Sequence, residues 1–234
     1  MQKRYITENI INCRDLGGYP CRGGVTAYGR ILRAGVARTP SEADLEVLRR
    51  FGIKTVIDLR GNEEAEDIPS YFKNSSEFDY LHVSLLEANP AFAQNNMTMP
   101  EVYELCLNDY KENFAKVLRF ISTLDAPFMF HCFCGKDRTG ILAALILSAA
   151  GVDKSDIIAD YEVSYTYIKD FIEKEIREKT GLIWEGNYDR FYSKREHMEH
   201  ILNYIDRTFG GAIGYFRHIG LTDDEISRIE NLLK

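Results

Sequence analysis

One ten-residue stretch, His131–Gly140, constrains this chain more than any other, because it joins two apolar runs of different character. The run before it, 127–130, is short and aromatic and predicts a buried strand. The run after it, 141–150, is rich in Ala, Leu and Ile and stops at Gly151, which predicts a buried helix with a glycine cap. The stretch is therefore predicted to be a strand–loop–helix junction, where backbone N–H groups at a helix N-terminus can hold an oxyanion.

Cys132 and Arg138 stand near the two ends of this loop, with five residues between them. If the loop curls, Cys132 lies at the floor of a cup of backbone amides, and Arg138 points its guanidinium at whatever fills the cup. A tetrahedral phosphate fits such a cup, and a guanidinium binds phosphate through two parallel hydrogen bonds. The thiolate of Cys132 is then placed for in-line attack on phosphorus. A buried structural cysteine beside a helix cap is the alternative interpretation.

Several residues of the loop are predicted to share in binding the phosphate and stabilising the thiolate. A helix dipole contributes only about 0.3–2 kcal/mol to an anion at its N-terminus, which is too little to make Cys132 a thiolate at neutral pH. The loop amides, the Arg138 guanidinium and the Thr139 hydroxyl must therefore contribute as well. His131 is expected to hydrogen-bond to the backbone and orient the thiolate rather than to act as a base. The predicted phosphate-binding residues are Phe133, Cys134, Gly135, Lys136 and Thr139.

The stretch 131–140 resembles the signature of the Cys-dependent protein tyrosine phosphatase superfamily, and its Gly-Lys-Asp-Arg-Thr-Gly form is similar to the bacterial branch of tyrosine and lipid phosphatases. The resemblance implies one α/β domain over residues 1–234, with a tyrosine-phosphatase-like central sheet flanked by helices and additional C-terminal helices. It is weakest over 86–107, which we interpret as a mobile or inserted segment. Three further stretches resemble the same branch: Asn12–Tyr19, Thr55–Arg60 and Gly220–Glu225. In the resembled family the first of these packs near the active site, where we expect Asp15 to be an ion-pair or turn partner.

Phosphoryl transfer to Cys132 requires an acid that protonates the leaving oxygen and then deprotonates water. Eukaryotic-type tyrosine phosphatases use an Asp on an upstream Trp-Pro-Asp loop, but the only Trp here is Trp184, which is downstream of Cys132 and has no Pro-Asp after it. Asp137, inside the loop, is the preferred candidate. Asp58, at the end of a predicted strand, is the second, and Glu101 or another carboxylate is the third. The alternative role of Asp58 is a salt bridge to Arg14, Arg60 or Arg138.

The function implied by the resemblance is phosphate-monoester hydrolysis through a cysteinyl-phosphate, with no metal and no cofactor. Phosphotyrosine proteins are the expected substrates, and phosphoserine, phosphothreonine and phosphoinositides are further candidates. Lys136 would suit a multiply phosphorylated substrate, although an ordinary surface lysine is an equal alternative. The expected ligand of the loop is phosphate or another oxyanion. Two other functions compete: a rhodanese-like sulfur transferase, and a catalytically silent phosphate-binding module.

The charge and composition of the chain limit which ligands and which cellular compartment we expect. The net charge of −7 argues against general nucleic-acid binding. No run reaches the roughly 18 apolar residues of a membrane span, so we expect no stable membrane insertion. The first ten residues are too polar for a signal peptide, and the five cysteines lack a disulfide-framework spacing. These features favour the cytoplasm, with secretion by a non-classical route left open. His131, Cys132 and Cys134 are too close together for a tetrahedral zinc site.

The remaining elements are predicted from periodicity and caps. Strands are predicted over 28–34, 53–59 and 79–85. Capping boxes are predicted at Ser41 with Asp44 and at Thr222 with Glu225. Residues 101–124 have helical spacing and could form one helix or two. Further helices are predicted over 153–179 and 194–208, with a loop over 181–192.

Overall fold

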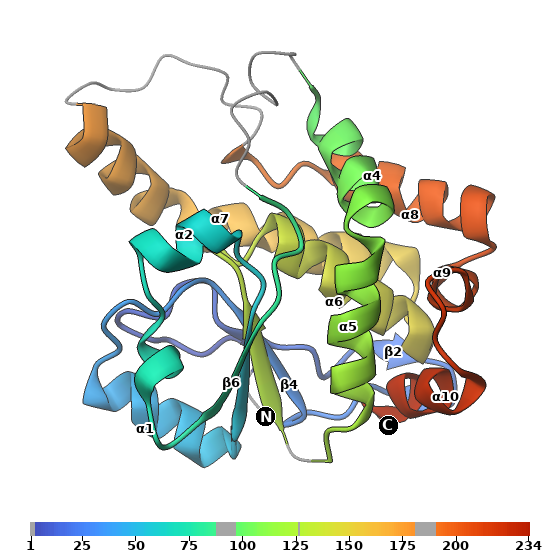
Figure 1. The fold of residues 1–234 in the computed structure, drawn as a ribbon, viewed down its shortest axis with the longest axis horizontal. Coiled ribbons are helices and arrows are strands. Elements are labelled where there is room, and N and C mark those ends of the chain that lie inside the picture. Colours follow the sequence, from blue (N-terminus) through green and yellow to red (C-terminus); the bar gives the residue numbers. More distant parts are fainter. Residues whose placement is uncertain (1–2, 88–96, 126, 181–190) are drawn as a thin grey trace.

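The computed structural model describes residues 3–87, 97–125, 127–180 and 191–234. A five-stranded mixed sheet lies at its centre, in the order β1-β4-β7-β5-β6, and a two-stranded ribbon, β2-β3, lies apart from it (Figure 1). β1 pairs antiparallel with β4, whereas β4, β7, β5 and β6 are all parallel. The strands are β1 (Arg14–Asp15), β2 (Pro20–Cys21), β3 (Gly24–Val25), β4 (Ile31–Ala34), β5 (Thr55–Asp58), β6 (Asp79–His82) and β7 (Phe128–His131).

The register of the parallel strands places three strand ends side by side. Ala34, the last residue of β4, pairs with His131, the last residue of β7, and His131 pairs in turn with Asp58, the last residue of β5. The segments that follow these strands therefore leave the sheet at one edge. That edge, at the carboxyl ends of parallel strands, is where ligands bind in open α/β sheets.

Alternation along β7 builds a separate apolar core on each face of the sheet. Phe128 and Phe130 join the larger core, with Ile57 of β5 and the apolar residues of α5 (Lys111–Ser122), α6 (Asp137–Ala150), α9 (Ala212–His218) and α10 (Asp223–Asn231). Met129 joins the smaller core, with Leu48 of α1 (Glu42–Phe51) and Phe72 of η1 (Tyr71–Asn74). Figure 1 accordingly shows α1 on one side of the sheet and α5, α6 and α10 on the other. This arrangement confirms the predicted α/β fold class.

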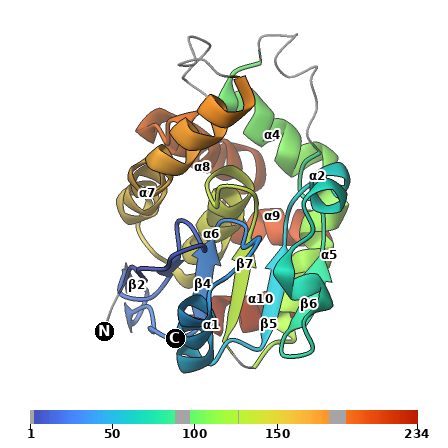
Figure 2. The same ribbon diagram turned by 90° about the vertical axis from the view of Figure 1, so that its left-hand side faces the viewer.

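The helix α6 lies next to the central strand and is buried along most of its length. In α6 the residues from Thr139 to Leu147 are all buried, because the helix lies between the sheet and other helices and is apolar on every side. Figure 2 shows that α4 and α7 lie toward the carboxyl ends of the strands. The helices are α1 (Glu42–Phe51), α2 (Asn62–Asp67), η1 (Tyr71–Asn74), α4 (Met99–Asp109), α5 (Lys111–Ser122), α6 (Asp137–Ala150), α7 (Lys154–Thr180), α8 (Arg195–Phe209), α9 (Ala212–His218) and α10 (Asp223–Asn231).

Most predicted elements are present, with differences at their ends. Both predicted capping boxes form, at the starts of α1 and α10. The strand predicted over 28–34 is shorter, because residues 28–30 form a turn in which Gly29 has a φ of 77°. Residues 101–124 contain two helices, since the backbone leaves helical geometry at Tyr110.

Two predicted segments fall partly outside the described residues. Of the segment 86–107, interpreted as mobile or inserted, residues 99–107 belong to α4 and residues 88–96 lie outside the described part of the chain. Residues 181–190 of the predicted loop, with Trp184, also lie outside it. Among the described helices, none combines the length and the apolar character that crossing a bilayer requires.

Candidate active site

The loop between β7 and α6 has the predicted strand–loop–helix form. β7 ends at His131, α6 begins at Asp137, and residues 132–136 connect them at the edge where β4 and β5 also end. Gly135 has a φ of 67°, and a Cβ there would stand 2.4 Å from the carbonyl oxygen of Ala34. Only glycine allows this backbone conformation and this close approach of two main chains.

Each carbonyl from His131 to Lys136 has a polar partner. The backbone N–H groups of Leu59, Val36 and Gly140 donate to the carbonyls of His131, Phe133 and Lys136, at 2.8, 2.9 and 2.7 Å. The Cys132 carbonyl lies 3.2 Å from Nδ1 of His131. Side chains from the N-terminal region bind the remaining carbonyls, of Cys134 and Gly135.

Several backbone N–H groups of the loop differ from its carbonyls in having no protein partner within the described ranges. Within the described ranges, no protein acceptor takes a hydrogen bond from the backbone N–H of Phe133, Cys134 or Gly135. These groups precede the N-terminus of a 14-residue helix, α6. A run of free N–H groups at such a place is an anion-binding concavity.

Cys132 and Arg138 lie within electrostatic reach of each other at this loop. Cys132 is 3% exposed and is the first residue after β7. Burial alone would lower the pKa of the Arg138 guanidinium, but Glu64 and the charge of a Cys132 thiolate raise it above its usual range. Arg138 is therefore a permanent cation beside Cys132.

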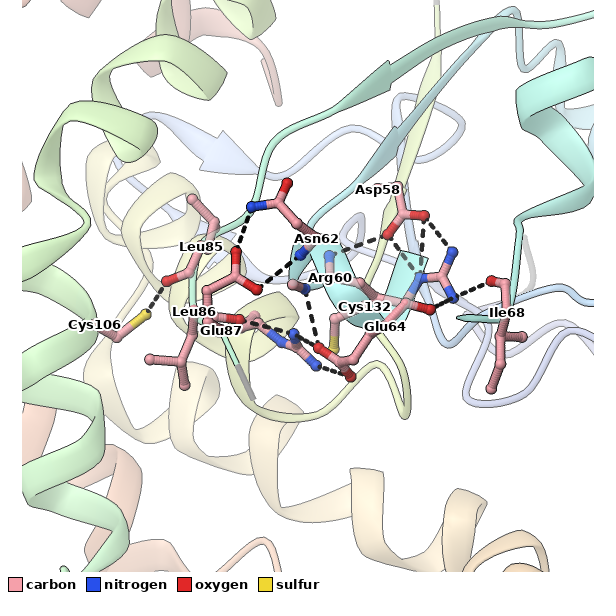
Figure 3. Close-up of polar contacts among 12 residues, drawn as sticks. Asp58, Arg60, Asn62, Glu64, Ile68, Leu85, Leu86, Glu87, Cys106 and Cys132 are labelled. Atoms are coloured by element: carbon pink, nitrogen blue, oxygen red, sulfur yellow. Dashed lines mark hydrogen bonds and ion pairs between the residues drawn. The ribbon is translucent and has the colours of Figure 1, made fainter. Parts of the chain in front are cut away.

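Glu64 holds Arg138 and was not identified from the sequence. Nη2 of Arg138 donates to Oε1 of Glu64 at 3.0 Å, Nη1 donates to Oε2, and Nη1 also donates to the Leu86 carbonyl at 3.1 Å (Figure 3). Glu64 also accepts a hydrogen bond of 3.0 Å from the backbone N–H of Gly61, and this contact caps the N-terminus of α2. In the sequence Glu64 belongs to an acidic run that resembles a solvated loop, and only its position three residues after Gly61 indicates a cap.

Asp58 forms a buried ion pair with Arg60, one of the partners considered from the sequence. Arg60 donates to both carboxylate oxygens, with Nη2 2.6 Å from Oδ2 and Nε 3.0 Å from Oδ1 (Figure 3), and the Tyr80 hydroxyl donates to Oδ2 at 2.8 Å. Both side chains of the ion pair are fully buried. Burial would raise the pKa of Asp58, but its charged surroundings and the Arg60 hydrogen bonds hold it well below its usual range.

His131 lies between this ion pair and the loop. Its Nδ1 is 3.8 Å from Oδ1 of Asp58, and burial lowers the pKa of the imidazole. Because the ring is neutral near pH 7, Arg60 is the charged partner of Asp58. Arg60 also donates to the Ile68 carbonyl at 2.7 Å and to the Glu64 carbonyl at 3.3 Å, so the ion pair holds α2 against β5.

Asp137 begins α6, and its carboxylate is fixed from two sides. The Tyr103 hydroxyl of α4 donates to Oδ1, and Nζ of Lys136 lies 3.4 Å from the same oxygen. The hydroxyl of Tyr161 on α7 lies 2.6 Å from that of Tyr103. The Asp137 side chain is 30% exposed, in contrast to Asp58. Glu101, the third candidate acid, caps α4 through Thr98 instead.

The other predicted loop residues have distinct surroundings. The Phe133 ring lies 6.0 Å from that of Phe171 on α7. Burial raises the pKa of the Cys134 thiol to about 12, so it is a neutral packed group at physiological pH. Lys136 is buried and donates to the Tyr192 carbonyl at 3.3 Å. The buried hydroxyl of Thr139 has no hydrogen-bond partner among the described residues.

The model of the tyrosine phosphatase family matches residues 6–234. This chain belongs to the tyrosine phosphatase family. That finding confirms the resemblance, and it gives no support to a rhodanese-like function. A tyrosine-protein phosphatase of Nostoc commune is 30% identical over 225 residues, which are 90% of this chain and 76% of that protein.

Two further similarities are more distant. The triple specificity protein phosphatase PtpB of Mycobacterium tuberculosis is 24% identical, over 88% of this chain and 91% of that protein. Among solved structures, TpbA of P. aeruginosa matches with a TM-score of 0.31 and 16% identity, over 66% of this chain and 90% of that one. A TM-score this low says nothing about the candidate active site described above.

The Asp58–Arg60 ion pair predicts a pH-dependent contribution to stability. Asp58→Asn should lower the free energy of unfolding by about 3–5 kcal/mol at pH 7, because it leaves the Arg60 charge buried without its partner. Because the pKa of Asp58 is lowered in the folded protein, the ion pair stabilises the fold fully at pH values above the ordinary pKa of Asp. This stabilisation is lost as the pH falls below that value toward the lowered pKa of Asp58. Urea unfolding between pH 7 and pH 3 should therefore show the variant approaching the wild type on acidification. A constant difference across this range would contradict the assignment.

The Glu64–Arg138 contact predicts a loss of activity without a loss of folding. Glu64→Gln keeps the shape of the side chain but removes its charge, so Arg138 is held less firmly. We expect kcat/KM for an aryl phosphate to fall about tenfold, which corresponds to a charge-assisted hydrogen bond of about 1.4 kcal/mol. The neighbouring exposed acid provides the control, Glu63→Gln. Equal effects of the two substitutions would show that Glu64 does not orient Arg138.

Proposed function

We propose that this protein hydrolyses phosphate monoesters through a cysteinyl-phosphate on Cys132, with phosphotyrosine in proteins as its main substrate. One observation carries the proposal: the carbonyls of residues 131–136 have polar partners, whereas the backbone N–H groups of residues 133–135, just before α6, have no protein acceptor within the described ranges. That arrangement suits the three non-bridging oxygens of a phosphate. The family membership and the name of the Nostoc relative support the choice of phosphotyrosine.

The proposed reaction has two displacements at phosphorus. In the first, the Cys132 thiolate forms an S–P bond while the bond from phosphorus to the tyrosine oxygen breaks, and Asp137 gives that oxygen a proton. In the second, water forms an O–P bond while the S–P bond breaks, and Asp137 takes the proton of the water. Arg138 and the loop N–H groups stabilise the charge that develops on the phosphoryl oxygens in both steps.

Asp137 is the better-supported acid of the two candidates. Its carboxylate is partly exposed at the N-terminus of α6, one residue from Arg138, so a leaving oxygen has access to it. The carboxylate of Asp58 is fully buried and bound by Arg60 and Tyr80. An acid must reach the proton acceptor before its pKa matters. The proposal therefore assigns Asp137 to proton transfer and Asp58 to the support of α2.

Phosphoserine, phosphothreonine and phosphoinositides are proposed as further substrates. The name of the PtpB relative, a triple specificity phosphatase, supports a breadth beyond phosphotyrosine. Lys136 adds a cation to the loop and lies 3.4 Å from the carboxylate of Asp137. A second phosphate on the substrate would compete with that carboxylate for the ammonium group. We therefore expect Lys136 to determine the preference of the enzyme between singly and multiply phosphorylated substrates.

Cys132→Ser should abolish turnover while leaving substrate binding in place. A serine hydroxyl is a much weaker nucleophile than a thiolate, so we expect kcat to fall by at least about 10⁴-fold. Phosphotyrosine peptides, phosphoserine peptides and phosphoinositides should be assayed in parallel, with Cys21→Ser on the distant β2 strand as the matched control. Turnover that survives in Cys132→Ser would refute the cysteinyl-phosphate mechanism. A wild-type enzyme without activity on the whole panel would instead favour a silent binding module.

Asp137→Asn should slow the enzyme in a way that depends on the leaving group. An aryl phosphate with a good leaving group needs little protonation, whereas phenyl phosphate needs much more, so the loss should be about 10²-fold or more only for the latter. The measurement is kcat/KM across a series of aryl phosphates, with Asp153→Asn as the control. A loss of equal size for every leaving group would remove Asp137 from the role of acid.

A further inference from the structure

We propose that Asn12 is the positioning residue of the phosphate-binding loop: its side-chain amide aims the loop N–H groups at the phosphate. This inference rests on the proposed function and adds to it a residue that touches neither the phosphate nor the nucleophile. Asn12 precedes the first strand and is separated from the loop by more than 120 residues of sequence. Its side chain nevertheless contacts the middle of the loop.

The contacts of Asn12 involve two successive peptide groups. Nδ2 donates to the carbonyl of Cys134 at 3.0 Å and to the carbonyl of Gly135 at 2.9 Å. Asn12 is 4% exposed, so water does not replace these bonds. It is also the only described non-glycine residue with a positive φ, 56°, a conformation that asparagine tolerates better than most residues. A backbone conformation this uncommon brings the amide to the loop.

The planarity of the peptide bond converts these contacts into an orientation of the N–H groups. In a trans peptide the C=O and the N–H point in opposite directions. Holding the carbonyls of Cys134 and Gly135 outward therefore turns the N–H groups of Gly135 and Lys136 inward. If either peptide rotated, a carbonyl oxygen would face the anion and repel it. One side-chain amide thus fixes the direction of two successive loop peptides.

The orientation of the Asn12 amide is itself determined by Arg14. Nη1 of Arg14 donates to Oδ1 of Asn12 and, at 3.2 Å, to its carbonyl. A guanidinium only donates, so the atom facing it must be the amide oxygen, and the NH₂ must face the loop. Arg14 is fixed in turn by Asp160 on α7, with 2.9 Å between Nε and Oδ1, and by the Ser164 hydroxyl, also at 2.9 Å.

Arg33 on β4 supports the same peptide from the other side. Its Nη2 donates to the Gly135 carbonyl at 2.8 Å and lies 3.4 Å from the Lys136 carbonyl. Its Nη1 is paired with Asp160 at 2.5 Å, so one carboxylate holds both arginines. Arg14, Arg33 and Asp160 are each no more than 3% exposed. The hydrogen bonds of Asn12 therefore belong to a buried network that ties β1, β4 and α7 to the loop.

The experiment exchanges the donor for an acceptor at constant size. Asn12→Asp puts an oxygen where Nδ2 stands, opposite two carbonyl oxygens. We expect kcat/KM for an aryl phosphate to fall about 100-fold, the cost of a small misplacement in a catalytic site. The concentration of inorganic phosphate that protects Cys132 from iodoacetamide should rise about tenfold, and alkylation of Cys132 should move to higher pH. Asn12→Gly, which accepts the positive φ and adds no charge, should show the same three changes at smaller size.

The control makes the same substitution at an unrelated amide. Asn231 Nδ2 donates to the Ser227 carbonyl within the exposed part of α10, and Asn231→Asp should leave all three measurements unchanged. If both Asn12 variants lower the unfolding midpoint but retain wild-type kcat/KM, phosphate protection and alkylation profile, Asn12 is a structural residue and the proposal is wrong. Protection and alkylation need no turnover, so they test Asn12 even if Cys132→Ser refutes the proposed hydrolysis.

Discussion

The loop between β7 and α6 depends on the direction in which its consecutive peptide groups point. The loop between β7 and α6 could bind an anion only if its N–H groups converge, and they converge only if its carbonyls are bound elsewhere. Buried carbonyls without partners cost free energy, so the surrounding structure must supply donors for all of them. Leu59, Val36 and Gly140 supply main-chain donors, and Asn12 and Arg33 supply side-chain donors.

These donors come from segments that the sheet register brings together. Val36 follows β4 and Leu59 follows β5, the two strands that flank β7 and end level with it. The main-chain donors are thus a consequence of parallel pairing. The side-chain donors require more, because Arg14, Arg33 and Asp160 are charged and buried. Burying charges is unfavourable unless they are paired and hydrogen-bonded, and Asp160 is the shared ion-pair partner of both arginines.

The sequence was sufficient to predict what depends on local pattern. The strand–loop–helix junction, the positions of Cys132 and Arg138 in it, and the caps at Ser41 and Thr222 all follow from neighbouring residues. Partners in space could not be predicted in the same way. Glu64 reaches Arg138 across 74 residues, and nothing in an acidic run distinguishes the member that will meet a guanidinium. Asp58 was correctly placed at a strand end, but its partner, Arg60, was one of three possibilities.

The distribution of carboxylates shows why a strand-end acid need not be a catalytic acid. Three carboxylates near the loop form ion pairs with four arginines: Asp58 with Arg60, Glu64 with Arg138, and Asp160 with both Arg14 and Arg33. A carboxylate in such a pair is stabilised as an anion and is a poor proton donor. Asp137 differs, because its partners among the described residues are the Tyr103 hydroxyl and the ammonium of Lys136. The fold therefore pairs three of these carboxylates with arginine and leaves Asp137, at the start of α6, without an arginine partner among the described residues.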